Sequence, residues 1–188
     1  RYPSMARKVN QPTANRQPPT AKRQPPTCIV ALDVPSLHAA RALVAQLGES
    51  ADFYKVGLQL YTNEGPRVVE WLRGAGKRVF LDVKLHDIPN TVRGAAQGAA
   101  ALDVQLLTVH ASGGEPMLAA AVEGGGGSVG VLGVTVLTSM TQADLEAARG
   151  HAVSSIADEV LRLSGVAARA GAHGIVCAGT EVAAVRAR

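Results

Sequence analysis

The sequence has 188 residues, of which 47% are hydrophobic and 18% charged, so we expect one domain with a buried core. This composition excludes a chain that is disordered throughout and a collagen-like chain, and two cysteines are too few for a disulfide framework. Aromatic residues make up only 3%, which argues against a surface that stacks the bases of single-stranded nucleic acid. No apolar run reaches the roughly 18 residues of a membrane helix.

The basic character of the chain is confined to residues 1–27. This segment carries six Lys and Arg residues and no acid, so the net charge of +4 becomes −2 for residues 28–188 and does not predict nucleic-acid binding. The segment also holds six of the ten prolines and repeats Arg-Gln-Pro-Pro-Thr at 16–20 and 23–27. We therefore predict a disordered Pro/Arg-rich tail over 1–27, without the apolar stretch of a secretory signal.

From Cys28 on, short β-branched runs alternate with helical stretches rich in Ala and Leu. The expected strands are Cys28–Leu32, Phe53–Val56, Arg78–Leu81, Leu106–Val109, Val129–Thr135 and Gly174–Val176. The expected helices are Leu37–Leu47, capped by Ser36, then Pro66–Ala75, Thr91–Ala101, Glu115–Glu123, Ser154–Ala170 and Thr180–Ala187. Strict alternation of six βα units predicts an α/β domain over 28–188, with a parallel sheet and crossover helices.

The placement of ionisable residues selects between two parallel architectures. These residues lie at or near the C-terminal ends of the predicted strands: Asp33, Lys55, Asp82, Lys84 and His110. Polar groups from several strands at one end are typical of a (β/α)₈ barrel active site. A doubly wound nucleotide fold would carry a glycine-rich turn after its first strand, where this sequence has no glycine. We predict a TIM-type barrel that is incomplete, with about six of its eight units.

The stretch from Asp82 to Thr91 reads Asp-Val-Lys-Leu-His-Asp-Ile-Pro-Asn-Thr. On a strand, Asp82 and Lys84 point to the same face, and Asp87 follows beyond the strand end. Nearby carboxylates favour the charged form of Lys84, which makes it a good proton donor and a poor Schiff-base nucleophile. The same carboxylates would repel an anionic substrate group that leaves as neutral CO₂. The alternative is a structural salt-bridge cluster, since such clusters also perturb pKa values.

These residues resemble the signature of the orotidine 5′-phosphate decarboxylase family. Further motifs in the order of that family are Ala31–Asp33, Lys55–Gly57, Val109–Gly114, Val134–Met140 and Gly174–Cys177. Related sugar-phosphate lyases and synthases share Asp-x-Lys-x-x-Asp, and the continuation Ile88–Thr91 distinguishes the decarboxylases from them.

The resemblance implies a lyase without metal or organic cofactor that converts orotidine 5′-monophosphate to UMP in pyrimidine biosynthesis. Lys84 would protonate C6 of the pyrimidine, and Asp82, Asp87 and Lys55 would complete the catalytic array. The implied substrate-binding residues are Asp33, Lys55, Asp82, Val83, Lys84, Leu85, His86, Asp87, Ile88, Pro89, Asn90, Thr91, Thr138 and Ser139. Among these, Asp33 and Lys55 would bind ribose hydroxyls, and Thr138 and Ser139 would contact the pyrimidine.

The resemblance also implies a cytoplasmic homodimer with shared active sites, in which Asp87 and Thr91 reach the site of the partner. No nucleic-acid or membrane partner is expected, and His110 is expected to be structural. Members of the family continue with two further strands and phosphate-binding loops that have no counterpart here, so we expect a truncated barrel with impaired activity. The alternatives are a sugar-phosphate lyase or synthase of the same superfold, and an inactive remnant whose tail is an interaction or targeting segment.

Overall fold

The computed structural model describes residues 27–187. Six parallel strands form one sheet in the order β1-β2-β3-β4-β5-β6, so each strand pairs with its neighbours in sequence. The strands are β1 (Val30–Ala31), β2 (Phe53–Gly57), β3 (Arg78–Leu85), β4 (Leu106–His110), β5 (Gly130–Val134) and β6 (Gly174–Val176). The disorder predicted for the tail concerns residues that, apart from Thr27, lie outside the described part of the chain.

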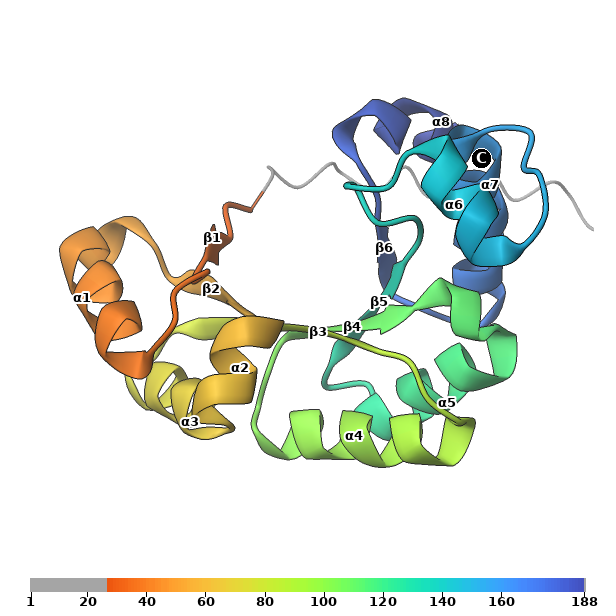
Figure 1. Ribbon diagram of the computed structural model, residues 1–188. Coiled ribbons are helices and arrows are strands. Elements are labelled where there is room, and N and C mark those ends of the chain that lie inside the picture. Colours follow the sequence, from red (N-terminus) through yellow and green to blue (C-terminus); the bar gives the residue numbers. More distant parts are fainter. Residues whose placement is uncertain (1–26, 188) are drawn as a thin grey trace, which may run out of the picture.

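The sheet curls into roughly half of a barrel, with helices on its convex side (Figure 1). The α-helices are α1 (Leu37–Leu47), α2 (Leu58–Glu64), α3 (Arg67–Gly74), α4 (Pro89–Ala101), α5 (Glu115–Gly125), α6 (Gln142–Arg149), α7 (Ile156–Arg169) and α8 (Val182–Arg186). Short 3₁₀ turns cover Gly48–Ser50, Ala111–Gly113 and Gly179–Glu181. Within residues 27–187, β1 and β6 have no strand on their outer sides. The predicted incomplete barrel of six βα units is therefore confirmed.

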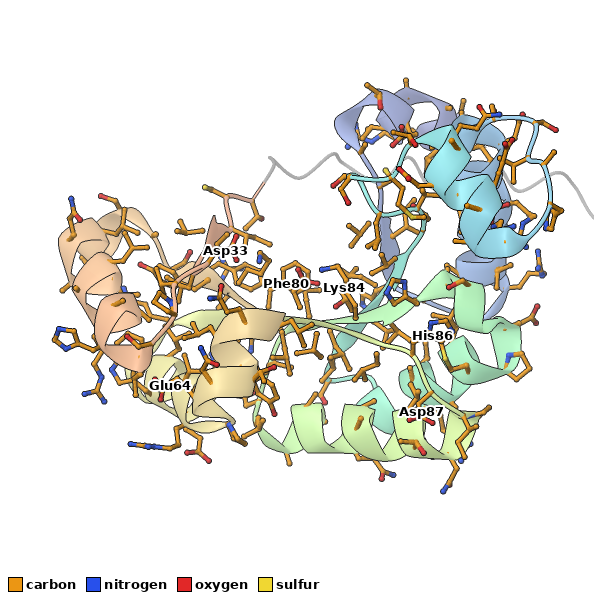
Figure 2. The ribbon with its side chains drawn as sticks, viewed as in Figure 1. Asp33, Glu64, Phe80, Lys84, His86 and Asp87 are labelled. Carbon is orange, nitrogen blue, oxygen red and sulfur yellow. The ribbon has the colours of Figure 1, made fainter. Side chains whose placement is uncertain are left out.

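Alternation along the strands separates an apolar face from a polar one. On β3, Val79 and Leu81 are buried under the helices, whereas Phe80 and Asp82 between and after them are only partly buried. Figure 2 shows Phe80 on the concave side of the sheet, opposite α4. The side chains of the convex face pack with α3 and α4 in one core that includes Leu72 and Val92. The core thus fixes the sheet from one side and leaves the concave side for polar groups.

Capping and proline residues determine where two of the helices begin. The Ser36 side chain accepts the N–H of Ala39 at 3.2 Å, which confirms the predicted cap of α1. Helix α4 begins at Pro89, two residues before the expected start at Thr91. Proline suits the first helical position, because the N–H that it lacks would have no partner within the helix there. This earlier start determines how the chain leaves β3.

Two helices and several strand ends differ from the sequence predictions. Helices α2 and α6 were not expected, although Thr141 and Asp144 form a capping box at the start of α6. Strand β1 is limited to two residues where Cys28–Leu32 was expected, since it has a partner strand on one side only. Strand β3 continues to Leu85, four residues past its expected end, and carries the first four residues of the Asp82–Thr91 motif.

Candidate active site

Four charged side chains from the first three strands meet on the concave face. The ammonium Nζ of Lys55 lies 2.9 Å from Asp33 Oδ1 and 3.7 Å from Asp82 Oδ2. The Nζ of Lys84 lies 2.8 Å from Asp82 Oδ1. Figure 2 shows Asp33 and Lys84 on the side of the sheet that faces away from α4. We call these four residues the charged array; its ion pairs link Asp33, Lys55, Asp82 and Lys84 in that order.

Strand register brings the array together. Ala31 pairs with Lys55, Lys55 pairs with Phe80, and Gly57 pairs with Asp82. Because paired residues of parallel strands point to the same face, Lys55 and Asp82 share the concave face, one pair apart. Gly57 has no side chain, which leaves room for the Lys55 ammonium and Asp33 Oδ1 beside it. The Asp33 side chain joins them from the residue stretch just after β1.

Partial burial strengthens the contacts of Asp82 with the two lysines, whereas Asp33 at the other end of the array is exposed. The side chain of Asp82 is 12% exposed, that of Lys55 21% and that of Lys84 34%. Charges held in a partly water-excluded site interact more strongly than the same charges in bulk water. An ammonium has three donors, and within residues 27–187 the Lys84 ammonium donates to Asp82 alone. The array therefore has N–H groups available to a ligand that enters the concave side.

The backbone at Lys84 adopts an uncommon conformation. Its φ is +50°, in the left-handed region, and the pairing of β3 with β4 shifts register between Leu81 and Leu85. A left-handed backbone costs a residue with a side chain about 1–2 kcal/mol. Such strain persists where the surroundings hold it, and it clusters at functional sites. The irregularity lies at the residue that the sequence assigned to proton transfer.

Asp87 does not join the charged array of its own chain. Its Oδ1 accepts the backbone N–H of Ile88 at 2.6 Å, and among the described residues none of the ion pairs includes it. Figure 2 shows Asp87 near the start of α4, apart from Lys84. The prediction that Lys84 lies between Asp82 and Asp87 therefore does not hold within one chain, because β3 ends at Leu85 and the chain turns at once into α4.

The rest of the Asp82–Thr91 motif divides into two groups. Val83 and Leu85 are partly buried and pack against the core. The residues after them are exposed: His86, Asp87, Ile88, Pro89, Asn90 and Thr91. Ile88 is 65% exposed, the highest value among the large apolar side chains of residues 27–187. The motif therefore presents a polar and apolar surface at the rim of the half-barrel.

The two predicted pyrimidine contacts lie in a different loop. Thr138 and Ser139 are exposed in the segment between β5 and α6. This segment follows the carboxyl end of β5, the same end of the sheet at which the other strands present their charged residues. No hydrogen bond of the described residues joins Thr138 or Ser139 to the charged array, so the structure places them at the same rim without direct contact.

Sequence reasoning missed one residue of the site, Thr108 on β4. Its side chain is fully buried, and its hydroxyl hydrogen bonds to Asp82 at 2.9 Å. A signal was available, because Thr108 is the single hydroxyl in the run Leu-Leu-Thr-Val and precedes His110 by two residues. Period-two alternation places it on the face that carries the array.

His110 contacts the other histidine of this region. The ring centroids of His86 and His110 are 5.4 Å apart. Burial lowers the pKa of His110, and the charges of His86 and Lys84 lower it further. The neutral form of His110 is thus favoured beside the array, as suits the structural role that the sequence suggested.

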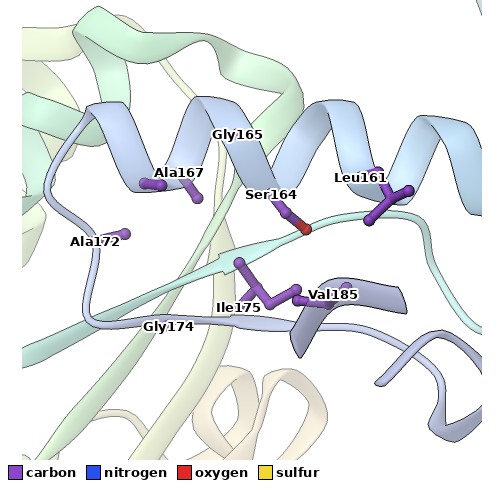
Figure 3. Close-up of a pocket in the computed structure, with 9 residues that line it drawn as sticks. Leu161, Ser164, Gly165, Ala167, Ala172, Gly174, Ile175 and Val185 are labelled. Atoms are coloured by element: carbon purple, nitrogen blue, oxygen red, sulfur yellow. The ribbon is translucent and has the colours of Figure 1, made fainter. Parts of the chain in front are cut away.

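An apolar pocket of about 430 Å³ lies away from the array, between α7, β6 and α8 (Figure 3). Small and aliphatic side chains line it, among them Ala167, Ile175 and Val185. The hydroxyl of Ser164 in its wall donates to the backbone carbonyl of Val160 at 2.7 Å. The lining holds no charged side chain, so this pocket lacks the groups that would bind a phosphate.

Residues 27–187 contain neither a helix suited to a bilayer nor a metal-binding cluster. No helix there combines the length and apolar character needed to cross a membrane. In the same residues, no cluster of three or more His, Cys, Asp or Glu side chains is arranged to hold a metal ion.

Known proteins match the chain over most of its length. The family model of the orotidine 5′-phosphate decarboxylase / HUMPS family matches residues 26–188. An orotidine 5′-phosphate decarboxylase of Anaeromyxobacter sp. (strain K) is 51% identical over 157 residues, which are 84% of this chain and 68% of the relative. That of Nostoc sp. is 45% identical over 166 residues, 84% of this chain and 69% of the relative.

Solved structures agree in fold. The crystal structure of orotidine 5′-phosphate decarboxylase from Lactobacillus acidophilus superposes with a TM-score of 0.80 at 35% identity, covering 86% of this chain and 75% of that one. The Methanocaldococcus jannaschii enzyme, crystallised with the inhibitor BMP, gives a TM-score of 0.67 at 23% identity, which supports the fold. The family match, the identity of the relatives and the charged array at the strand ends agree: the chain belongs to the orotidine 5′-phosphate decarboxylase family.

Proposed function

We propose that the charged array decarboxylates orotidine 5′-monophosphate to UMP. The observation that carries this proposal is the contact of Lys84 Nζ with Asp82 Oδ1 at 2.8 Å, beside the Lys55–Asp33 pair. Asp82 holds the ammonium of Lys84 in place, and its negative charge faces the region where a carboxylate of the substrate would lie. Repulsion between these anions is relieved when the substrate group leaves as CO₂.

The proposed reaction balances with groups of the chain and water. The bond between C6 and the carboxylate breaks, CO₂ leaves, and the electron pair stays on C6. The Lys84 ammonium gives one proton to C6 and becomes an amine, which water reprotonates. Positive charge fixed beside the developing carbanion lowers the barrier, because the donors are oriented before the reaction begins. The proposed step uses neither a metal nor an organic cofactor.

Substrate binding is proposed to draw on three regions. Asp33 and Lys55 hold the ribose hydroxyls, since their paired charges lie next to the array. Thr138 and Ser139 contact the pyrimidine from the loop after β5. The segment from Val83 to Thr91 encloses the reacting end, with Val83 and Leu85 supporting the site from the core and the exposed residues from His86 onward at its rim.

We further propose that two copies of the chain share their sites. Among residues 27–187, Asp87 forms no ion pair with its own Lys84, and Ile88 beside it exposes 65% of its surface. A second copy that covered this rim would bury Ile88 and receive Asp87 next to its array. Thr91, exposed in the first turn of α4, would reach the same partner site. Since the proposed substrate is an intermediate of nucleotide synthesis, we place the homodimer in the cytoplasm, with no nucleic-acid partner.

A spectroscopic assay tests the reaction. The extended chain is defined here as this chain joined to the part of the Anaeromyxobacter relative that follows its matching region. Conversion of the orotate ring to uracil changes the ultraviolet absorbance, so turnover is followed directly, and the same protein is offered a sugar phosphate as the alternative substrate. We expect loss of the orotate absorbance. A folded, monodisperse extended chain that leaves orotidine 5′-monophosphate unchanged but acts on the sugar phosphate would overturn the proposal.

A further inference from the structure

The buried hydroxyl of Thr108 connects two neighbouring strands at the charged array. Thr108 lies in the middle of β4, is fully buried, and has the apolar Leu107 and Val109 on either side. Phe80 on β3 pairs with Leu106 on β4, so the next position on the concave face sets Thr108 beside Asp82. A hydroxyl buried in this way needs partners, since an unpaired buried polar group is destabilising.

Both partners of this hydroxyl belong to the array. The backbone N–H of Lys84 donates to Thr108 Oγ1 at 2.9 Å, and the hydroxyl donates to Asp82 Oδ1 at 2.9 Å. A hydroxyl has one proton to donate and lone pairs to accept, so the two bonds are compatible. The same Oδ1 receives the Lys84 ammonium at 2.8 Å. A closed ring therefore joins the Lys84 backbone, Thr108, Asp82 and the Lys84 side chain.

This ring lies at the irregular point of β3. Lys84 has φ +50°, and regular pairing with β4 resumes only at Leu85 and Val109. The N–H of Lys84 is thus bound by a side chain of β4 where a regular ladder would use the backbone. That bond stabilises the left-handed conformation, which otherwise has a free-energy cost for a residue other than glycine.

We propose that Thr108 is a positioning residue for the decarboxylation, an inference that rests on the proposed function. Its hydroxyl holds the Lys84 backbone in the bulge and holds the Asp82 carboxylate at the orientation that receives the ammonium. Being fully buried, it acts on the substrate only through Asp82 and Lys84. Loss of the hydroxyl would let the proton donor move, and small displacements of reacting groups reduce rates by large factors.

The first measurement needs no activity. Thr108→Val keeps the shape of the side chain and removes the hydroxyl, while Thr108→Ser keeps the hydroxyl. In the full 188-residue chain, amide hydrogen exchange at Lys84 is measured by NMR. We expect about tenfold faster exchange in Thr108→Val, corresponding to one lost hydrogen bond, and parent-like exchange in Thr108→Ser. Unchanged Lys84 exchange in a folded Thr108→Val chain would overturn the proposal.

The second measurement concerns catalysis in the extended chain. We expect kcat to fall roughly 10²-fold in Thr108→Val with KM nearly unchanged, and Thr108→Ser to recover most of kcat. Thr135→Val is the matched control, because Thr135 is also buried but its hydroxyl donates to the carbonyl of Val176 at 2.8 Å. That variant should keep kcat even if its melting temperature falls.

The outcomes separate this inference from the proposed function. If the parent extended chain decarboxylates and Thr108→Val keeps its kcat, Thr108 has no positioning role. If the parent does not decarboxylate, the proposed function fails, and Lys84 exchange still decides whether the hydroxyl holds the bulge. Should Thr108→Val fail to fold, Thr108→Ser decides the question: a folded serine variant that loses both Lys84 protection and kcat contradicts the proposal.

Discussion

Gly57 passes so close to Lys55 that a Cβ atom at position 57 would lie 3.2 Å from the ammonium Nζ. The same Cβ would lie 3.2 Å from Asp33 Oδ1, the partner of that ammonium. The φ of Gly57 is −85°, which any residue can adopt, so the backbone does not demand glycine. Glycine at this position therefore keeps space for the ion pair.

Gly57→Ala should consequently reduce activity more than stability. The Lys55 and Asp33 side-chain ends would have to move by a few tenths of an ångström, and we expect kcat/KM to fall about tenfold, or about 1.4 kcal/mol. The melting temperature should change little. Steady-state kinetics and thermal unfolding of the extended chain test both expectations. Gly98→Ala is the control, because its Cβ would meet no atom within 4 Å; equal kinetic effects in the two variants would contradict the argument.

Lys84→Ala should abolish most of the decarboxylation. Loss of a positioned proton donor lowers a rate by about 10²–10⁴-fold, and the lost positive charge beside C6 adds to this. The ultraviolet assay on the extended chain measures kcat. Lys77→Ala serves as control, since the Lys77 ammonium donates to the carbonyls of Gly48 and Ala51 and lies outside the array. Near-normal kcat in Lys84→Ala would show that another group delivers the proton.

Mixing two inactive variants tests whether sites are shared. Asp87→Asn and Lys84→Ala are made in separate extended chains and then mixed. If Asp87 serves the partner, a mixed dimer has one site with both lesions and one with neither, so part of the activity should return. Subunit exchange is verified by mass spectrometry of labelled chains. Verified exchange without any recovery would place Asp87 in the site of its own chain.

The outer sides of β1 and β6 lead to a prediction on association. Within residues 27–187 these strands lack outer partners, and unpaired strand edges favour association with other chains. We expect the chain alone to self-associate and the extended chain to be monodisperse with much higher kcat/KM, since phosphate contacts remote from the reacting carbon also lower the barrier. Size exclusion with light scattering and the ultraviolet assay compare the two. Equal size distributions and equal kcat/KM would refute this.

The lowered pKa of His110 gives a pH dependence of stability. Burial is its main cause, followed by the charges of His86 and Lys84. Below the usual pKa of about 6.5 the unfolded chain binds the proton more readily than the folded one, so stability is retained above that pH and is lost as the pH falls through the folded pKa. In His110→Gln the melting temperature should fall less between about pH 7.5 and about pH 5.5. His38→Gln, at an exposed position on α1, should behave like the parent.

Sequence patterns predicted the fold class because each strand is a short β-branched run and each crossover is long enough for a helix. They also placed Asp33, Lys55, Asp82 and Lys84 together, since residues at the ends of neighbouring parallel strands must meet. Helix α2 was missed because Thr62 and Tyr61 weaken its helical signal and Gly65 ends it after two turns.

Other features depend on tertiary contacts that a local pattern does not contain. The left-handed backbone lies at Lys84, where the sequence has no glycine that would have predicted it. It accompanies the hydrogen bond from the Lys84 N–H to Thr108 on another strand. The orientation of Asp87 follows from the immediate start of α4 at Pro89, so one chain separates two carboxylates that are only five residues apart. In both cases the motif was recognised from the sequence, whereas its geometry depends on the neighbouring elements β4 and α4.

The sequential strand order has a consequence for how the gene could change. The charged array and its buried neighbour Thr108 all precede α5 in the sequence, whereas the loop with Thr138 and Ser139 follows β5. The proposed proton transfer and the proposed pyrimidine contacts thus occupy consecutive stretches of the coding sequence. A recombination between relatives near codon 120 would exchange the proposed pyrimidine contacts and keep the charged array, with its proposed ribose contacts, intact.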